Sequence, residues 1–192
     1  DKTRALRIIG GQWRGRKLCF PDLEGLRPTG DRIRETLFNW LTPRLPGSHC
    51  LDLFAGSGAL GLEALSRGAE ETLLLEKNPA AATQLRANLD RLGCALGQVI
   101  ATDSLSWLAR ETPRPFDHIF IDPPFDVDLW QACIDQLASR PWLAEGADIY
   151  IETDPGRTLT TPDNWRLHRD KTSGQVRYRL FIASPTEAEK QD

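Results

Sequence analysis

After residue 48, the hydrophobic and polar positions alternate between two kinds of segment. Short apolar runs bounded by glycine, proline or polar residues are typical of buried strands. Longer stretches with apolar residues three and four apart are typical of helices that cover a sheet. The predicted strands are 49–54, 71–76, 98–102, 117–122 and 147–152, and the predicted helices are 59–67, 80–92, 104–110 and 128–139. This alternation predicts an α/β fold built of parallel βαβ units.

The two ends of the chain follow other patterns. Residues 165–169 and 176–182 are β-like runs joined at Ser173-Gly174, which predicts a hairpin and at least one antiparallel strand. Near the start, runs at 6–9 and 17–20 predict a small β element.

An amphipathic helix follows at 31–41, with Asp31 as its expected N-cap. We therefore expect a basic N-terminal extension of residues 1–45, made of the β element and the helix and packed on the main domain. The main domain is then expected to cover residues 46–183, and residues 184–192 are expected to form a polar, disordered tail.

The composition is that of an ordinary globular protein. The 192 residues are 40% hydrophobic and 27% charged, and no stretch approaches the roughly 20 apolar residues that span a bilayer. No secretory signal is visible, so we expect a cytoplasmic protein. The four cysteines are far apart and form no CxxC pair, so we expect reduced thiols and no metal site.

The net charge of −3 is unevenly distributed. Residues 1–50 carry ten Lys or Arg against five Asp or Glu, and residues 165–182 carry five against one. Residues 51–164 carry eight against eighteen. Basic segments on an otherwise acidic protein favour a polyanionic partner, although solvated surface arginines remain an alternative.

A glycine-rich segment, DLFAGSGALG at residues 52–61, connects the first strand to the first helix of the main domain. Gly56, Gly58 and Gly61 match G-x-G-x-x-G in the position where a dinucleotide or another adenosyl cofactor binds at the carboxyl edge of a parallel sheet. Glycines allow the tight turn and the close approach of the backbone to the ligand.

Three acidic residues lie at strand ends, where they could contact an adenosyl cofactor. Glu76 can accept hydrogen bonds from both ribose hydroxyls. Two of the three favour S-adenosylmethionine over NAD. Asp52 would repel a pyrophosphate but not an aminoacyl group or a sulfonium, and Asp103 ends the third strand, within reach of an adenine amino group. Strand-end capping is the alternative role for each of them.

The fourth strand ends in Asp122-Pro123-Pro124-Phe125. Topology is expected to place this corner beside the first strand, at the point where the strand order reverses. A carboxylate and a rigid proline carbonyl offer two acceptors for a planar –NH₂ group, and Phe125 offers a flat apolar face. The sequence therefore predicts a site for an amine on a base or an amide.

Several of these segments resemble the bacterial RsmD family of 16S rRNA guanine-N2 methyltransferases, which act at guanine 966. The segments are DLFAGSGALGLEA (52–64), DPPF (122–125), RIIGGQWRGRKL (7–18), LRPT (26–29), RIRETLFNW (32–40) and GQVRY (174–178). The resemblance covers residues 6–182, with one departure at Gly30, where we expect a hydroxyl residue in relatives. It implies a class I S-adenosylmethionine-dependent methyltransferase fold, which is Rossmann-like. This fold has a seven-stranded mixed sheet with helices on both faces, here with a small N-terminal β element and helix.

The residues and the resemblance together predict three sets of site residues. The catalytic set is Asp122, Pro123 and Phe125. The cofactor-binding set is Asp52, Phe54, Gly56, Gly58, Glu76, Lys77, Asp103 and Ser104. The RNA-binding set is Arg7, Arg14, Arg16, Lys17 and Arg177.

The predicted function is methyl transfer from S-adenosylmethionine to N2 of guanine 966 in 16S rRNA. The expected partner is the small ribosomal subunit or its late assembly intermediate, and a monomer is expected. The alternatives are an enzyme of the same fold acting on adenine N6 in DNA or RNA or on a protein amide, and a noncatalytic nucleic-acid-binding protein. An NAD oxidoreductase is disfavoured by Asp52 and by the lack of a positioned His or Tyr–Lys pair.

Overall fold

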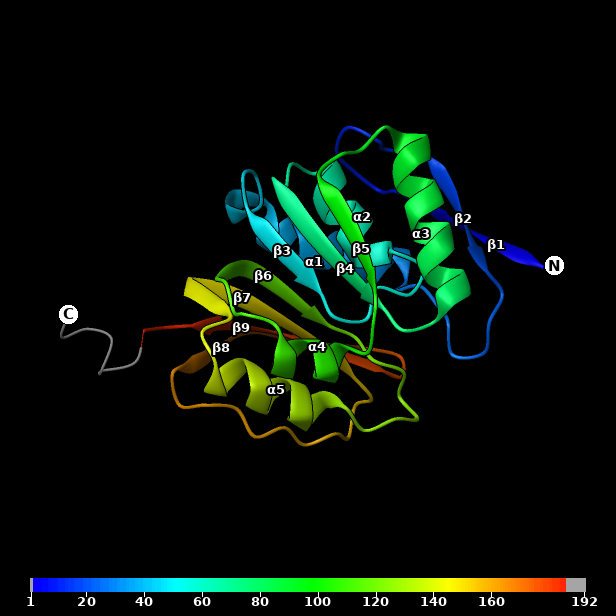
Figure 1. Ribbon diagram of the computed structural model, residues 1–192. Coiled ribbons are helices and arrows are strands. Elements are labelled where there is room, and N and C mark those ends of the chain that lie inside the picture. Colours follow the sequence, from blue (N-terminus) through cyan, green and yellow to red (C-terminus); the bar gives the residue numbers. More distant parts are fainter. Residues whose placement is uncertain (1, 186–192) are drawn as a thin grey trace. The chain divides into compact units, whose positions relative to one another are not determined.

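The computed structural model describes residues 2–185 of the chain, which divides into two compact units, Asp1–Ser104 and Leu105–Asp192 (Figure 1). Their strands make up the seven-stranded mixed sheet of a Rossmann-like class I methyltransferase fold, which confirms the predicted fold class. The boundaries expected after residues 45 and 183 stay predictions. Residues 186–192 of the expected tail lie outside the described residues.

The first unit contains three parallel strands in the order β5-β4-β3. Their bounds are His49–Asp52 for β3, Glu71–Glu76 for β4 and Gly97–Ala101 for β5, with helices α2 at Ala59–Ser66 and α3 at Pro79–Leu92. All five elements lie within two residues of their predicted ends. The start of α3 is fixed by Asn78, whose side chain accepts hydrogen bonds from the amides of Ala80 and Ala81, while Pro79 occupies the first helical position.

The N-terminal part of this unit is a hairpin of β1 (Thr3–Arg7) and β2 (Lys17–Pro21), followed by α1 (Asp31–Leu41) and a short 3₁₀ helix at Thr42–Arg44. Figure 1 shows α3 running alongside β2. The side-chain amide of Asn88 in α3 donates to the backbone carbonyl of Cys19 at 2.8 Å, which joins the hairpin to the helix. The predicted small β element is therefore present.

The turn of this hairpin is held by a buried carboxylate. Glu63 of α2 is 0% exposed and accepts hydrogen bonds from the amides of Ile9 at 2.8 Å and Gly10 at 3.0 Å. Arg67 donates to the same carboxylate at 3.0 Å, and Arg34 of α1 lies 3.4 Å from it. The carboxylate thus has four donors, as a buried charge requires.

A close backbone approach fixes the same turn against the end of α2. The amide of Gln12 donates to the carbonyl of Ser66 at 2.8 Å. Gly11 has φ +78°, and a Cβ atom there would lie 1.9 Å from that carbonyl oxygen. Only glycine satisfies both the conformation and the space at this position.

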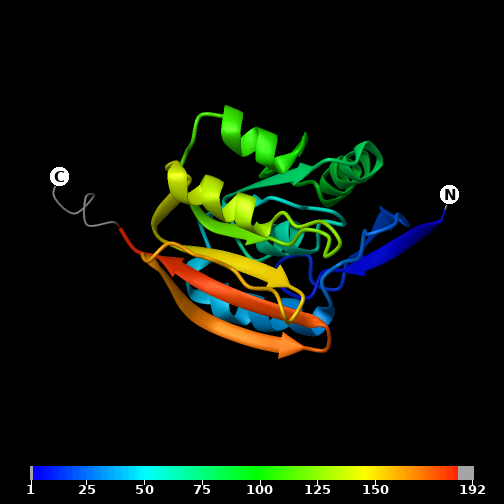
Figure 2. The ribbon, with the colours of Figure 1, turned by 90° about the horizontal axis from the view of Figure 1, so that it is seen from below.

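The second unit contains the strands β6 (Phe116–Ile121), β7 (Leu143–Thr153), β9 (Val176–Ala183) and β8 (Trp165–Ser173) in that order. The pair β6–β7 is parallel, whereas β9 is antiparallel to both β7 and β8, as the hairpin prediction requires. Figure 2 shows β7, β9 and β8 side by side in yellow, red and orange. The helices are α4 (Ser104–Arg110), whose first residue ends the first unit, and α5 (Trp130–Ser139).

The structure gives findings on the cysteines, on membrane spans and on groups of metal-ligating residues. All four cysteines are free thiols, with Cys50 and Cys133 buried and Cys19 and Cys94 half-buried. Within residues 2–185, no helix is long and apolar enough to cross a bilayer. Within the same range, no three His, Cys, Asp or Glu side chains are grouped as a metal site would need.

The expectation that Asp31 caps α1 is wrong. The N-cap is Gly30, at φ −58° and ψ 151°, and no side chain accepts a hydrogen bond from the first turn. Asp31 is already helical, and its carboxylate accepts a hydrogen bond from Arg34 at 2.6 Å instead. The capping pattern therefore misplaces the N-cap by one residue.

We predict that Gly30→Ser stabilises the protein by about 0.5–1 kcal/mol. The backbone angles suit an L-residue, a Cβ atom meets nothing within 4 Å, and the hydroxyl can cap the free amides of α1. Urea unfolding measures the change. Gly30→Ala is the control, because it adds the Cβ atom without the cap and should be about 1 kcal/mol less stable than the serine variant. Equal stability of the two variants would contradict the capping role.

Candidate active site

The predicted glycine loop has the backbone that its sequence indicates. Gly56 and Gly58 have φ of +55° and +87°, and Gly58 is the N-cap of α2. At Gly61, a Cβ atom would lie 2.7 Å from the Leu74 side chain and 3.1 Å from the carboxylate of Asp52. The first two glycines therefore allow the turn, and the third lets α2 approach the strands beneath it.

Asp52, at the end of β3, is a buried carboxyl group with one unpaired oxygen. It is 1% exposed, and Oδ2 accepts a hydrogen bond from the amide of Gly61 at 3.0 Å. Oδ1 is buried and has no hydrogen-bond partner within residues 2–185. Burial raises the pKa of Asp52 to about 7, and the charge of Glu76 adds to this effect, while the amides of Gly61 and Phe54 oppose it.

Glu76, at the end of β4, is held by two backbone amides. Oε2 accepts from Gly56 at 2.7 Å, and Oε1 accepts from Asn78 at 2.9 Å. Each carboxylate oxygen keeps a second acceptor position, which suits the two hydroxyls of a ribose. The link to Gly56 also ties the glycine loop to the neighbouring strand.

The other predicted cofactor residues lie at the same carboxyl ends of β3, β4 and β5. Phe54 and Asp103 are half-buried, and Lys77 is exposed. Ser104 is buried and its hydroxyl donates to the carbonyl of Leu53, so it joins the start of α4 to the loop. The first unit therefore brings all eight predicted cofactor residues to one edge of its strands.

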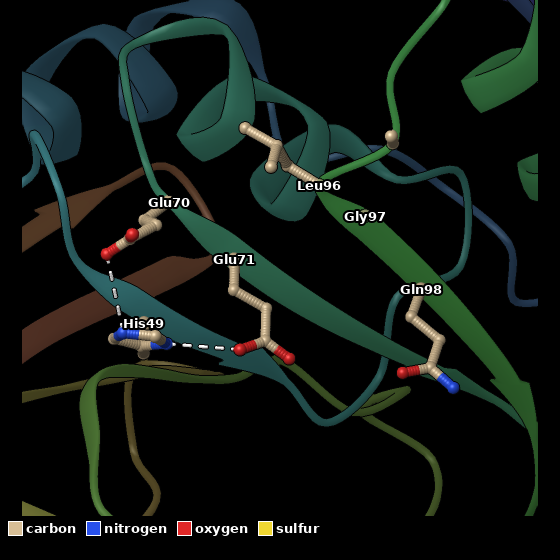
Figure 3. Close-up of a pocket in the computed structure, with 7 residues that line it drawn as sticks. His49, Glu70, Glu71, Leu96, Gly97 and Gln98 are labelled. Atoms are coloured by element: carbon tan, nitrogen blue, oxygen red, sulfur yellow. Dashed lines mark hydrogen bonds and ion pairs between the residues drawn. The ribbon is translucent and has the colours of Figure 1, made fainter.

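A pocket of about 400 Å³ lies at the opposite, amino ends of these strands (Figure 3). His49 starts β3 there, with its ring nitrogens 3.1 Å from Glu71 and 3.6 Å from Glu70, and Leu96 and Gln98 line the pocket as well. It contains none of the predicted site residues. The pocket is therefore separate from the candidate cofactor site.

The Asp-Pro-Pro-Phe corner lies in the second unit, directly after β6. Asp122 is half-buried, Pro123 is buried and Phe125 is 36% exposed. The carbonyl of Pro124 accepts the amide of Val127 at 3.2 Å. The corner thus carries a half-buried carboxylate and an exposed aromatic ring on a turn that contains two prolines.

Two residues that support Phe125 were missed by the sequence reasoning. Trp130, at the start of α5, is fully buried with its ring 5.9 Å from that of Phe125, and its indole N–H donates to the carbonyl of Glu152 at 2.8 Å. The guanidinium of Arg157 lies 4.0 Å from the Trp130 ring centroid and pairs with Asp154 at 2.7 Å. Phe125, Trp130 and Arg157 thus lie in successive contact, which restrains the Phe125 ring.

A second buried group lies near Asp122. The hydroxyl of Tyr150 donates to Glu152 at 2.9 Å, and both side chains are buried. Burial, and then the charges of Glu152 and Asp122, hold the pKa of Tyr150 well above its usual range. Tyr150 therefore stays protonated and keeps donating its hydrogen bond beside the corner.

The predicted RNA-binding residues divide into two groups. Arg7, Arg14, Arg16 and Lys17 are exposed on the N-terminal hairpin and pair with no carboxylate within residues 2–185. Arg177 on β9 differs, because it makes two hydrogen bonds to Asp170, at 3.0 and 2.7 Å. Trp13 of the same hairpin is half-buried and packs against the core of the first unit.

A glycine loop, a buried aspartate and a glutamate suited to a ribose, on a seven-stranded mixed sheet, define a class I S-adenosylmethionine-dependent methyltransferase fold. Residues 6–182 match the model of the family described as conserved hypothetical protein 95. The chain belongs to this family, which is the RsmD family that the sequence resembles.

Its relatives bear out this assignment over most of their length. The chain is 51% identical to the ribosomal RNA small subunit methyltransferase D of Escherichia coli, covering 92% of this chain and 89% of the relative. It is 50% identical to the protein of the same name from Haemophilus influenzae, covering 92% and 93%. Among solved structures, the putative methyltransferase yhhF from Escherichia coli matches with a TM-score of 0.89 and 46% identity, over 95% of this chain and all of that one.

A more distant structure supports the fold alone. The Thermus thermophilus 16S rRNA N2 G1207 methyltransferase, solved with AdoMet and guanosine, matches with a TM-score of 0.66 at 22% identity. The match covers 96% of this chain and 50% of that one.

We predict that Asp52→Asn makes the cofactor-free protein more stable, by an amount that grows with pH. The pKa of Asp52 is raised in the folded protein, so the buried carboxyl group destabilises the wild-type fold once it must ionise. This cost is absent below pH 4 and grows as pH rises towards 7. The stability difference between variant and wild type should therefore increase by about 2–4 kcal/mol between pH 4 and pH 8. Urea unfolding across this range measures it. Asp90→Asn, which removes an exposed carboxylate on α3, is the control. A difference that does not change with pH would contradict the buried, protonated state.

Proposed function

We propose that the protein transfers a methyl group to the exocyclic N2 of guanine 966 in 16S rRNA. The observation that carries the proposal is 50–51% identity, over nearly the whole chain, to proteins named ribosomal RNA small subunit methyltransferase D. The protein is thus a methyltransferase of small-subunit rRNA. We propose five further points beyond this class of enzyme. They are the guanine, its position, the late assembly intermediate as substrate, the monomeric state and the cytoplasmic location.

The cofactor is S-adenosylmethionine, which supplies an electrophilic methyl group. The residues of the first unit suit it. The unpaired Oδ1 of Asp52 accepts the ammonium of the aminoacyl part, and Glu76 accepts the ribose hydroxyls while the two amides hold its carboxylate in place. Asp103 accepts the adenine amino group, with Phe54, Gly56, Gly58, Lys77 and Ser104 completing the site.

The corner of the second unit positions the amine. The lone pair of guanine N2 is delocalised into the ring, so the amine must be oriented before it can attack. Asp122 and the carbonyl of Pro123 accept its two hydrogens, which directs the lone pair away from these two acceptors. Phe125, held by Trp130 and Arg157, stacks on the base.

Bound S-adenosylmethionine would supply the methyl group, with its sulfonium sulfur as the leaving group. The methylated nitrogen would carry a positive charge until it loses one proton. Asp122 already accepts one of the two hydrogens, so it stabilises the developing positive charge as that proton moves to solvent.

The test is tritium transfer from labelled S-adenosylmethionine to small subunits lacking the modification, to naked 16S rRNA and to DNA. Nuclease digestion then separates N2-methylguanosine from N6-methyladenosine. Label in N2-methylguanosine at position 966 supports the proposal. Label in N6-methyladenosine would replace it with the adenine alternative.

In this assay, Asp122→Ala should lower the single-turnover rate by about 100-fold. The change removes a charged acceptor at the amine and leaves the cofactor site of the first unit untouched. Calorimetry should show S-adenosylmethionine affinity close to that of wild type. Asp126→Ala, which removes an exposed carboxylate four residues further along, is the matched control. A rate near wild type for Asp122→Ala would refute the proposed role.

Replacing Arg14, Arg16 and Lys17 by alanine should weaken binding to the small subunit. Attraction to phosphates depends on salt, so the plot of log affinity against log salt should flatten by roughly 0.7–0.9 for each phosphate that is no longer neutralised. Filter binding at several salt concentrations measures this. Cofactor affinity should be unchanged, and Arg86, Arg91 and Arg110 replaced by alanine serve as the control. If the control weakens binding equally, the N-terminal hairpin is not the RNA-binding element.

A further inference from the structure

The outermost strand of the second unit, β8, carries exposed basic side chains that the proposed function does not use. Its sequence is WRLHRDKTS, and Arg166, Arg169 and Lys171 are all exposed. Within the described residues, β8 pairs with β9 on one side only. Figure 2 shows it in orange at the margin of the sheet of this unit.

A β-bulge brings these three cations to one face of the sheet. The pairing with β9 is Arg166 to Ile182, Arg169 to Leu180 and Lys171 to Tyr178, with a register shift between Leu167 and Arg169. The three partners are alternate residues of β9, so they and the cations opposite them share a face. In a regular strand Arg166 and Arg169, three residues apart, would point to opposite faces.

The one acidic residue of β8 does not neutralise these cations. Asp170 pairs with Arg179 in the register and binds Arg177 through both carboxylate oxygens, and all three lie on the other face. Within residues 2–185, no carboxylate forms an ion pair with Arg166, Arg169 or Lys171, and Arg166 lies 3.5 Å from a ring nitrogen of His168. The surface formed by the three cations, here called the β8 surface, is therefore positively charged.

The β8 surface shares its sheet face with the end of β6. Lys171 pairs with Tyr178, and Tyr178 pairs with Glu152 of β7. Glu152 follows Ile151, whose partner Ile121 precedes Asp122. Lys171, Tyr178, Glu152 and Asp122 therefore form one row of side chains across the sheet. Lys171 and Asp122 are three strands apart, which is roughly 14 Å at about 4.8 Å per strand.

We propose that Arg166, Arg169 and Lys171 bind phosphates of the rRNA strand next to the target base. The inference rests on the proposed function, because the RNA is the polyanion that this function supplies. Arg and Lys side chains fix the register of a nucleic acid through its phosphates, and a cationic row that leads to Asp122 suits this task. Arg177, which the sequence reasoning selected, is occupied by Asp170.

The test compares binding of unmodified small subunits by four proteins at several salt concentrations. They are wild type, the triple variant R166Q/R169Q/K171Q, the relocation variant L167R/R169Q, and a control with Arg86, Arg91 and Arg110 replaced by Gln. Leu167 is 46% exposed and lies opposite Phe181 on the other face. The relocation variant therefore moves one cation across the sheet at constant net charge.

The triple variant should bind the subunit more weakly, with cofactor affinity unchanged. Its plot of log affinity against log salt concentration should have a slope that is shallower by roughly 0.7–0.9 for each phosphate that is no longer neutralised. For the relocation variant, the slope should become shallower by the amount expected for about one phosphate. If wild type binds and methylates the subunit but both variants behave like the control, the inference that the β8 surface binds RNA is refuted. The proposed function then still stands.

Two further outcomes are distinguishable from these. If the triple variant aggregates with unaltered RNA binding, the charges serve only to block edge pairing, which also refutes the inference. If wild type neither binds nor methylates the subunit, the proposed function itself fails.

Discussion

The buried carboxylate of Glu63 determines how the first unit is put together. An ionised group removed from water is stable only when donors surround it, and removing one partner of a buried pair typically costs about 3–5 kcal/mol. Its donors come from the N-terminal turn, from α1 and from the end of α2. The exposed cations of the hairpin are therefore carried on a rigid support rather than on a loose arm.

Arg34 extends this network to the segment before α1. It is 1% exposed, and besides Glu63 it donates to the carbonyls of Thr29 and Arg7. One side chain thus joins the end of β1, the residues preceding α1 and the carboxylate of α2. The resemblance of residues 7–18 and 26–40 to the RsmD family has a physical counterpart here, because these stretches meet around two buried charges.

The parts of the structure that could be predicted from the sequence are those with local causes. Apolar periodicity located the strands and helices, and the glycine pattern located a turn in which Gly56 and Gly58 have positive φ and Gly61 allows close packing. Asn78-Pro79 located the start of α3. Asp31 was misplaced by one residue, because a capping pattern does not distinguish an N-cap from a first helical position.

The rest depends on contacts between residues distant in sequence. Glu63 lies in an ordinary helical stretch, and its backbone partner Ile9 is 54 residues earlier, so no local pattern shows that it is buried. Trp130 and Arg157 are in contact although 27 positions separate them, because the segments after β6 and β7 meet. The pairing of Arg177 with Asp170 depends on the hairpin register, which composition does not contain.

The irregularity at His168 has a consequence for how this protein varies among species. The extra residue in β8 determines which face of the sheet each side chain before it occupies. A single insertion or deletion of an uncharged residue there would move these side chains to the opposite face without altering the total charge of the strand. Two homologues with the same number of arginines could then differ in where they hold a nucleic acid. The number of residues in this strand therefore determines the position of its charges as much as the identity of the residues does.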